Sequence, residues 1–124
     1  FGIFVDGEFS GEINLSAVQR GPFQAGSIGY WIDEARAGQG YTPEAVVVLA
    51  KYCFDDLHLH RLEIAIVPRN GASRRVVEKL ELRDEGLAKG FLEINGNWED
   101  HVRYGITFED WLERGPSLCE AWLS

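Results

Sequence analysis

Apolar side chains recur along this chain with two different periods, and the change between them marks its central segment. Between residues 27 and 33 they alternate with small or polar side chains, which predicts a β-strand. From residue 46 onward they recur every three or four positions, which predicts an α-helix. The inward positions are Ile28, Tyr30 and Ile32 in the strand, and Val46, Leu49, Ala50, Cys53 and Leu57 in the helix. The helix is therefore expected to pack against the strand that precedes it.

A glycine-rich turn, Gly38-Gln39-Gly40, joins this strand to the helix. Thr42 is predicted as the N-cap, Pro43 suits the first helical position, and Glu44 places negative charge in the first turn. Backbone N–H groups from Gly38 to Thr42 would then face one concavity at the positive end of the helix dipole, which is typical of a phosphate site. An ordinary tight turn is the alternative, and the motif lacks the third glycine of a dinucleotide-binding fingerprint.

The same patterns place strands on both sides of this segment. Residues 1–5 and 12–18 are predicted as strands joined by a hairpin turn at Asp6-Gly7. Residues 61–67 alternate again and end at Pro68, which predicts another strand. A strand, helix and strand in this order predict two parallel neighbours joined by a right-handed crossover.

The last part of the chain predicts a short helix, a hairpin and a tail. Asn70 is expected to cap the short helix. The inward residues of that helix are Ser73, Val76, Val77 and Leu80. Residues 87–94 and 98–107 flank Asn95-Gly96-Asn97 and predict a β-hairpin. Residues 108–124 are an acidic tail, in which one or two short helices around Gly115-Pro116 are expected.

Composition and charge narrow the class of protein. The 124 residues are 45% hydrophobic, which suits a single domain, residues 1–124, with its own core. The formal net charge of −8 argues against a nucleic-acid partner. No apolar run approaches the ~20 residues that span a membrane, so no membrane partner is expected. Cys53 and Cys119 are expected to be reduced thiols of a cytoplasmic protein.

Residues 34–80 are the only part of the chain without an acidic excess. Four of their basic side chains, Arg36, Arg69, Arg74 and Arg75, are near predicted loops. They favour a local polyanion site beside the glycine turn. Pairing of these arginines with surface carboxylates is the alternative, and spacing alone does not separate the two interpretations.

Other groups of chemically active residues are weaker candidates. His58, His60 and His101 lack cysteines or carboxylates at zinc-type spacing, so no metal site is expected. The run from Trp98 to His101 is interpreted as the polar face of a hairpin strand rather than as an acid–base group. The sequence contains no nucleophile-elbow or P-loop motif.

Three motifs in this order carry a resemblance to a known family. They are AGQGYTPEA at residues 37–45, RLEIAIVPRNGASRRVVEKL at residues 61–80, and a hairpin ending in WEDHVRYGI at residues 98–106. Together they resemble the acetyl-CoA-dependent N-acetyltransferases of the GNAT superfamily, specifically the RimJ/RimL type. The resemblance covers about residues 1–107 and depends on the joint spacing of the motifs, because none of them is specific alone.

This resemblance implies an α+β (mixed α/β) fold, with a central mixed, mostly antiparallel sheet, a strand–helix–strand core that binds coenzyme A, and a C-terminal β-hairpin. In the family, main-chain N–H groups of the glycine loop hold the diphosphate of the coenzyme. The pantetheine arm pairs with the central strand where that strand splays from its neighbour. The residues implied in acetyl-CoA binding are Trp31, Ile32, Asp33, Ala37, Gly38, Gln39, Gly40, Tyr41, Thr42, Asn70, Ser73 and Arg74.

The reaction implied is direct attack of a primary amine on the thioester, with Ser73 protonating the departing thiolate. A peptide N-terminal α-amine is the expected acceptor because its pKa of about 8 leaves a far larger neutral fraction than the pKa of a lysine, about 10.4. A small-molecule amine is the alternative. The alternative role for Ser73 is to bond the start of its own helix. The candidates for a general base are unranked: Asp33, Glu34, Glu93 and Asp100.

The sequence departs from the family at several positions. Ala37 stands where Arg or Gln is usual, Val77 where many members have a catalytic tyrosine, and Glu81-Leu82 where Gly-Phe is usual. The family's first strand and first two helices have no counterpart, so an N-terminal portion is expected to be missing. A non-catalytic coenzyme-binding module is therefore the alternative function. A homodimer that pairs the open first strand is also considered.

Overall fold

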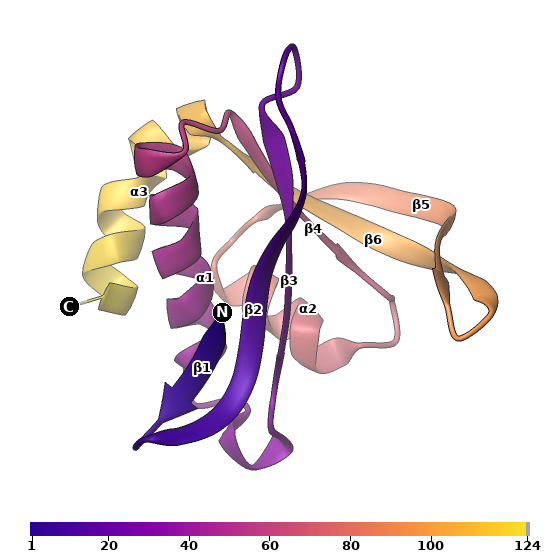
Figure 1. Cartoon of the computed structure of the whole chain (residues 1–124), viewed down its shortest axis with the longest axis horizontal. Helices are drawn as coiled ribbons and strands as arrows, with labels where there is room; N and C mark the ends of the chain where they lie inside the picture. Colours follow the sequence, from indigo (N-terminus) through magenta and orange to yellow (C-terminus); the bar gives the residue numbers. More distant parts are fainter. Residues whose placement is uncertain (124) are drawn as a thin grey trace.

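Six strands form a single twisted sheet in the computed structural model, which describes residues 1–123 (Figure 1). The strands are β1 (Gly2–Val5), β2 (Glu8–Gln19), β3 (Ala25–Ile32), β4 (Arg61–Ile66), β5 (Arg83–Ile94) and β6 (Asn97–Thr107). Their order across the sheet is β1-β2-β3-β4-β6-β5, and every neighbouring pair is antiparallel except β3 with β4. The expected mixed, mostly antiparallel sheet with a C-terminal hairpin is therefore confirmed.

Helices pack against one face of this sheet. They are α1 (Tyr41–Lys51), α2 (Gly71–Lys79) and α3 (Phe108–Leu123), with a 3-10 turn η1 (Glu34–Arg36) before α1 and a π-helical turn η2 (Tyr52–Asp56) after it. Figure 1 shows α1 beside α3, and α2 near β3 and β4. Alternate side chains of the strands meet the helices in one core, which includes Ile13, Ile28, Val46, Phe54, Leu62, Ile64, Val77, Tyr104 and Ile106.

Four of the five residues predicted to face inward from this helix are buried. Val46, Leu49, Ala50 and Cys53 are buried, and Leu57 is half buried. Val47 is buried as well, which the sequence pattern did not predict. Since α1 packs against both the sheet and α3, its buried stripe is wider than that of a helix with one neighbour.

The start of α1 differs from the prediction that Thr42 is its N-cap. The helix begins at Tyr41, and its N-cap is Gly40, which has a φ of 89° and no side-chain cap. Thr42 and Pro43 are therefore the second and third helical residues, so the prediction for Pro43 is also wrong. Glycine reaches this left-handed conformation without strain, and a proline is tolerated at the third position because its N–H would have no intrahelical acceptor.

Both predicted hairpin turns are present. Asp6 and Gly7 have φ values of 51° and 82°, and Asn95 and Gly96 have φ values of 51° and 84°. Two successive positive φ angles match the twist of antiparallel strands. The strand β5 is longer than predicted because two register shifts interrupt its pairing with β6 and hide its alternation.

Residues 108–123 form one helix, so the prediction of short helices around Gly115-Pro116 is wrong. A reciprocal pair of hydrogen bonds between Thr107 and Asp110 caps its start, at 2.9 and 3.2 Å. The helix continues through Gly115 and Pro116. Trp111, one turn earlier, packs over Gly115, where an added Cβ would lie 2.9 Å from the indole. The last residue of the predicted tail, Ser124, lies outside the described residues.

No helix within residues 1–123 is long and apolar enough to cross a membrane. Cys53 and Cys119 are free thiols, as predicted. Burial raises the pKa of the Cys53 thiol to about 11, so this thiol stays protonated and unreactive at neutral pH.

Replacing Phe54 by alanine is expected to lower the free energy of unfolding by about 3–5 kcal/mol, because it leaves a cavity in the core. Phe54 is 1% exposed, and its ring stacks on Trp111 with centroids 5.5 Å apart. Urea unfolding measures the change. Trp98→Ala is the control, since this side chain is 68% exposed and its loss should cost less than about 1 kcal/mol. Equal losses in the two variants would contradict this description of the core.

Candidate functional site

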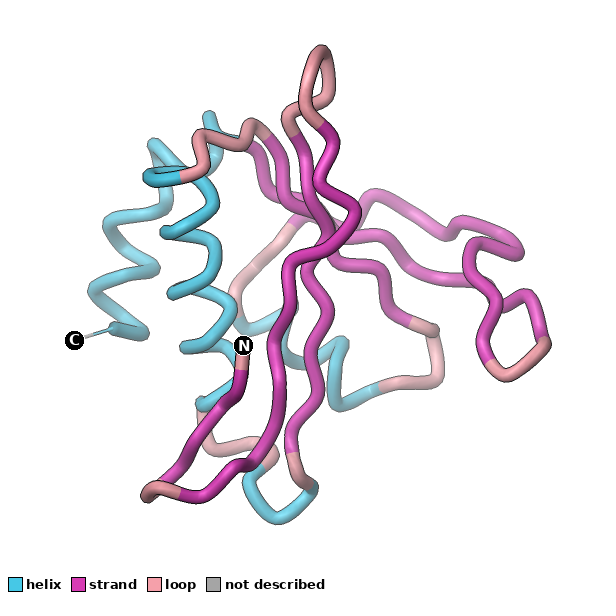
Figure 2. The backbone as a smooth tube through the Cα atoms, viewed as in Figure 1, coloured by secondary structure: helices cyan, strands magenta, loops and turns pink. Residues whose placement is uncertain are grey.

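The strands β3 and β4 separate soon after they pair. Their parallel ladder covers only residues 25–27 of β3 and 61–63 of β4. Figure 2 shows the two strands diverging beyond this point. The later residues of β3 therefore have no strand partner on that side, and their backbone groups need other partners.

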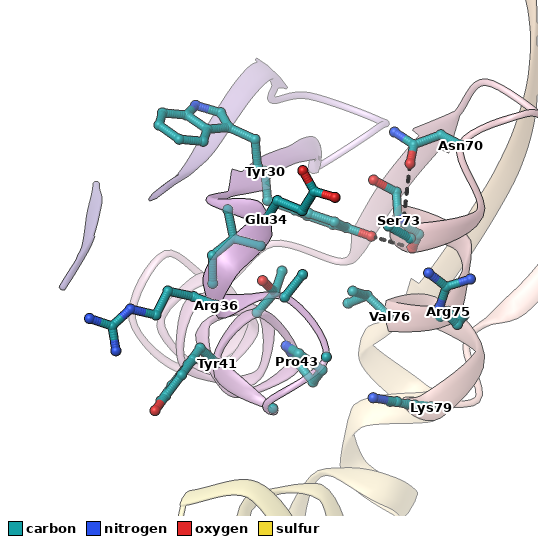
Figure 3. A pocket seen from close by; sticks show the side chains of 17 residues that line it. Tyr30, Glu34, Arg36, Tyr41, Pro43, Asn70, Ser73, Arg75, Val76 and Lys79 are labelled. Atoms are coloured by element: carbon teal, nitrogen blue, oxygen red, sulfur yellow. Dashed lines mark hydrogen bonds between the residues drawn. The ribbon is translucent and has the colours of Figure 1, made fainter. Parts of the chain in front are cut away.

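A cavity of about 520 Å³ lies along the end of β3 on this side (Figure 3). One wall is formed by the end of β3, the turn η1 and the glycine loop, another by the first turn of α1, and a third by one side of α2. The site is thus built from two segments, residues 30–43 and 70–79.

The glycine loop presents unpaired backbone donors to the cavity. Gly38 and Gly40 have φ values of 78° and 89°, which other residues rarely adopt. Within residues 1–123, no backbone hydrogen bond of a turn or cap uses the N–H groups from Gly38 to Thr42. The positive end of the α1 dipole therefore faces the cavity with its donors free, which favours an anionic ligand.

The last residues of β3 offer a second set of backbone donors. The N–H of Asp33 donates to the carbonyl of Ser10 in β2 at 2.7 Å. Successive residues of an antiparallel strand direct their backbone groups to opposite edges, so the N–H groups of Tyr30 and Ile32 face the gap left by β4. An extended ligand lying along β3 would accept hydrogen bonds from these two residues, whereas the N–H of Asp33 is already in use.

Asn70 and Ser73 form the wall contributed by α2. Asn70 caps this helix as predicted, with its Oδ1 accepting the Ser73 N–H at 3.1 Å. That bond uses the backbone of Ser73, and in the described part of the chain the Ser73 hydroxyl has no hydrogen-bond partner. Figure 3 shows the Ser73 side chain next to Asn70 at the cavity. The hydroxyl does not bond the start of its own helix and is available to a ligand.

Tyr30 connects β3 to α2 across the cavity. Its phenol donates a hydrogen bond to the backbone carbonyl of Ser73 at 2.8 Å, drawn as a dashed line in Figure 3. Burial raises the pKa of this phenol well above its ordinary value, and the nearby Tyr104 raises it further. The phenol therefore remains a donor at neutral pH, and the bond holds the first turn of α2 against β3.

The charged side chains at the cavity are mostly positive. Arg36, Arg75 and Lys79 line it together with one carboxylate, Glu34, although the chain carries a formal net charge of −8. Two carboxylates of the β1–β2 hairpin hold Arg36, with N–O distances of 3.7 and 3.3 Å. Arg75 and Lys79 have no acceptor within residues 1–123. The local charge is thus opposite in sign to that of the whole chain.

Most of the residues that the resemblance implies lie together at this cavity. Those that line it are Trp31, Ile32, Ala37, Gly38, Gly40, Tyr41, Thr42, Asn70 and Ser73. Glu34, a candidate general base, and Arg36 and Arg75, two of the arginines expected at a polyanion site, line it as well. Sequence reasoning did not single out the lining residues Pro43, Ala72, Val76 and Lys79 for the site. Ala72, Arg75, Val76 and Lys79 recur at steps of three and four residues, and this helical spacing was the available signal that they share one face.

Three of the residues that the resemblance implies in acetyl-CoA binding do not line the cavity. The N–H of Asp33 is bonded to β2, the Gln39 side chain donates to the carbonyl of Ala35, and an Nη atom of Arg74 donates to the carbonyl of Pro68. Arg69, another candidate for a polyanion site, pairs with Glu99 instead. Of the four acidic candidates for a general base, only Glu34 lines the cavity.

Two of the three histidines are engaged outside the cavity. Nε2 of His60 lies 2.8 Å from the Glu109 carboxylate, and Nδ1 of the buried His101 donates to the carbonyl of Glu99. Among residues 1–123, no three His, Cys, Asp or Glu side chains are grouped so that they could hold a metal ion.

Comparison with known sequences assigns this architecture to a family. The model of the acetyltransferase (GNAT) domain matches residues 1–83. A probable N-acetyltransferase of Bacillus subtilis, YjcK, is 44% identical over 112 residues, which are 89% of this chain and 62% of that protein. The [ribosomal protein uS5]-alanine N-acetyltransferase of Escherichia coli is 36% identical over 113 residues, covering 90% of this chain and 58% of the enzyme.

Solved structures agree with this assignment. Mycobacterium smegmatis RimJ, in complex with CoA-disulfide, superposes with a TM-score of 0.85 and 35% identity over 95% of this chain and 56% of that one. The ribosomal-protein-S5-alanine acetyltransferase of Vibrio fischeri has a TM-score of 0.78 and 38% identity over 86% of this chain and 58% of its own. The chain thus spans about three-fifths of the length of these relatives.

Replacing Tyr30 by phenylalanine is expected to lower the free energy of unfolding by about 1 kcal/mol at pH 7, because one part-buried hydrogen bond is lost. The pH dependence gives a second readout. A phenol whose pKa is raised by folding contributes stability that is complete below pH ~10 and declines as the pH rises through the folded value. The difference between wild type and variant should therefore shrink above pH ~10.

Chemical denaturation at pH 7 and at pH 10.5 measures both effects. Tyr52→Phe is the matched control, because Tyr52 is exposed and its phenol makes no hydrogen bond within residues 1–123. A constant difference between wild type and Tyr30→Phe at both pH values would show that the phenol is not the stabilising group.

Proposed function

This chain belongs to the GNAT acetyltransferase family, and on that premise we propose that its cavity binds acetyl-CoA and that the protein transfers the acetyl group to a primary amine. The observation that carries the proposal is the combination of free N–H groups from Gly38 to Thr42 with cationic side chains in one cavity. Coenzyme A is a polyanion, and such a cavity in an acidic chain selects for one. Residues 1–124 act in this proposal as one domain.

The groups at the cavity suit the coenzyme in a definite order. Its diphosphate accepts hydrogen bonds from the N–H groups between Gly38 and Thr42, at the positive end of α1. Its pantetheine arm then lies along β3 and takes the place that β4 leaves vacant. The amides of the arm pair with the free backbone groups of Tyr30 and Ile32, as a strand would.

The proposed chemistry needs little from the protein beyond orientation, one carbonyl-polarising donor and one proton. A backbone N–H of β3 donates to the thioester carbonyl and stabilises the charge that develops on its oxygen, an effect worth about 3 kcal/mol in other acyl-transfer sites. The amine attacks the carbonyl carbon as the C–S bond breaks. The Ser73 hydroxyl donates its proton to the departing sulfur, which demands little because a thiol of pKa ~8.5 is a good leaving group. The amine nitrogen loses one proton as the amide forms, and that proton restores the Ser73 hydroxyl, so the products are the amide and the free thiol.

We infer a protein or peptide N-terminal α-amine as the acceptor. An α-amine with a pKa of about 7.7–8.0 is partly neutral at pH 7, whereas a lysine near 10.4 is almost fully protonated and cannot attack. The net charge of −8 would attract a basic substrate. The names of two relatives, which are ribosomal-protein alanine acetyltransferases, support the same class of acceptor.

Replacing Gly38 by aspartate is expected to weaken acetyl-CoA binding at least ~10-fold, because a carboxylate in the glycine loop repels the diphosphate. Isothermal titration of the whole chain measures the dissociation constant. Gly96→Asp is a matched control: both glycines have positive φ, and a Cβ added at either one would have no neighbour within 4 Å. Gly96 lies in the β5–β6 turn, so the control should bind normally. Absence of binding by the folded wild type would refute the proposed function.

Replacing Ser73 by alanine is expected to lower kcat roughly 10- to 100-fold and to change the dissociation constant of acetyl-CoA little. The loss is at the low end for a general acid because the leaving thiol is already acidic. Thiol release from acetyl-CoA with a peptide acceptor measures kcat. The control is Ser16→Ala, an exposed serine on β2 outside the cavity. An unchanged kcat would remove Ser73 from the mechanism.

A further inference from the structure

Two cations at the cavity lack the partners that the other basic side chains have. Within residues 1–123, each lysine and arginine contacts an oxygen acceptor except Arg75, Lys79 and Lys89. Even Arg20 and Arg74 donate to backbone carbonyls. Arg75 and Lys79 both line the cavity, whereas Lys89 is exposed on β5 away from it. With 20 acidic residues in the chain, two unpaired cations side by side call for an explanation.

The spacing of these two residues supplies one. They lie four residues apart on α2, and therefore one above the other on the same side of the helix. Like charges at this spacing destabilise a helix. An anion bound between the two cations would attract both of them and offset their mutual repulsion. Val77 and the C-cap residue Leu80 anchor the opposite side of α2 in the core, so the side of the helix that carries the two cations is turned toward the cavity.

The backbone donors of the glycine loop lie on the opposing side of the same cavity. Figure 3 shows Arg75 and Lys79 on α2, with Tyr41 and Pro43 of the α1 start between them and Arg36. Arg36 is already neutralised by Asp6 and Glu8. One cavity therefore holds two separate anion-binding features: main-chain N–H groups with a helix dipole, and a free pair of side-chain cations.

Coenzyme A carries two separate anionic groups, a diphosphate and a 3′-phosphate monoester on its ribose. We propose that Arg75 and Lys79 bind the 3′-phosphate and make the site selective for coenzyme A over its 3′-dephospho form. This inference depends on the proposed function, because it assigns the second anion-binding feature of the same cavity. A dianionic monoester bound by one arginine and one lysine forms charge-assisted hydrogen bonds, and these are stronger than bonds between neutral groups.

Isothermal titration with coenzyme A and with 3′-dephospho-coenzyme A tests the proposal on the whole chain. The wild type should bind coenzyme A at least ~10-fold more tightly than the dephospho form. In the double variant Arg75→Gln with Lys79→Gln, this ratio should fall to about twofold or less, while the dissociation constant of the dephospho form stays unchanged. Raising the salt concentration should reduce the wild-type ratio, because exposed charges are screened.

The control is Lys89→Gln, which removes the third unpaired cation at a position outside the cavity and should keep the wild-type ratio. All three side chains are exposed, so circular dichroism is expected to show folded variants. Equal weakening of both ligands in the double variant would mean that the cations contact the diphosphate, which overturns the inference and leaves the proposed function standing. Failure of both ligands to bind the folded wild type would overturn both.

Discussion

The separation of β3 from β4 is the constraint on which the rest of the structure depends. Parallel strands normally satisfy each other's backbone groups along their whole length, yet these two stop after three paired residues. A buried backbone group without a partner costs about 1–3 kcal/mol, so the gap persists only where water or a ligand can reach it. The cavity is therefore a consequence of the sheet topology. The backbone N–H groups of Tyr30 and Ile32, which face the gap, are the donors that it offers to a ligand.

Elements far from the gap keep it open and in register. Tyr30 connects β3 to the first turn of α2 where the strands no longer do so. On the other side, α3 packs along α1, and a Cβ at Gly40 would lie 3.7 Å from the ring of Trp122. The C-terminal helix thus supports the loop that presents the N–H groups from Gly38 to Thr42. The continuity of α3 through Pro116 places its far end beside this loop.

The cavity differs in charge from the rest of the molecular surface. On the face of the sheet that the helices do not cover, basic and acidic side chains neutralise one another. Arg61 pairs with Glu85, and Arg103 pairs with Glu63. Exposed pairs of this kind contribute little to stability, but they leave no net positive charge on that surface. At the cavity the balance is reversed, because Arg75 and Lys79 remain unpaired. A chain of net charge −8 therefore contains one cavity whose local charge suits an anionic ligand.

The sequence by itself determined the strands, the order of the elements and the location of the glycine loop, because periodicity and turn residues act over a few neighbouring positions. Asn70 was predictable as a cap for the same reason. The exact start of α1 was not, since Thr42 and Gly40 are both acceptable N-caps and only the left-handed backbone at Gly40 decides between them. The continuity of α3 was not predictable either, and the helix is held by a non-local contact, the stacking of Trp111 on Phe54.

The residues of the site also differ in whether local sequence could predict them. Ser73 and the loop glycines could be selected from motif spacing, since each lies within a few residues of the turn that positions it. The sequence could not predict that Asp33 and Arg74 turn away from the cavity. The backbone N–H of Asp33 bonds to β2, and the Arg74 side chain donates to the carbonyl of Pro68. Nor could the sequence distinguish Arg69, which reaches Glu99, from Arg75, which reaches no carboxylate. Local preferences determine where chain elements form, but only tertiary packing decides which polar groups are left without a partner.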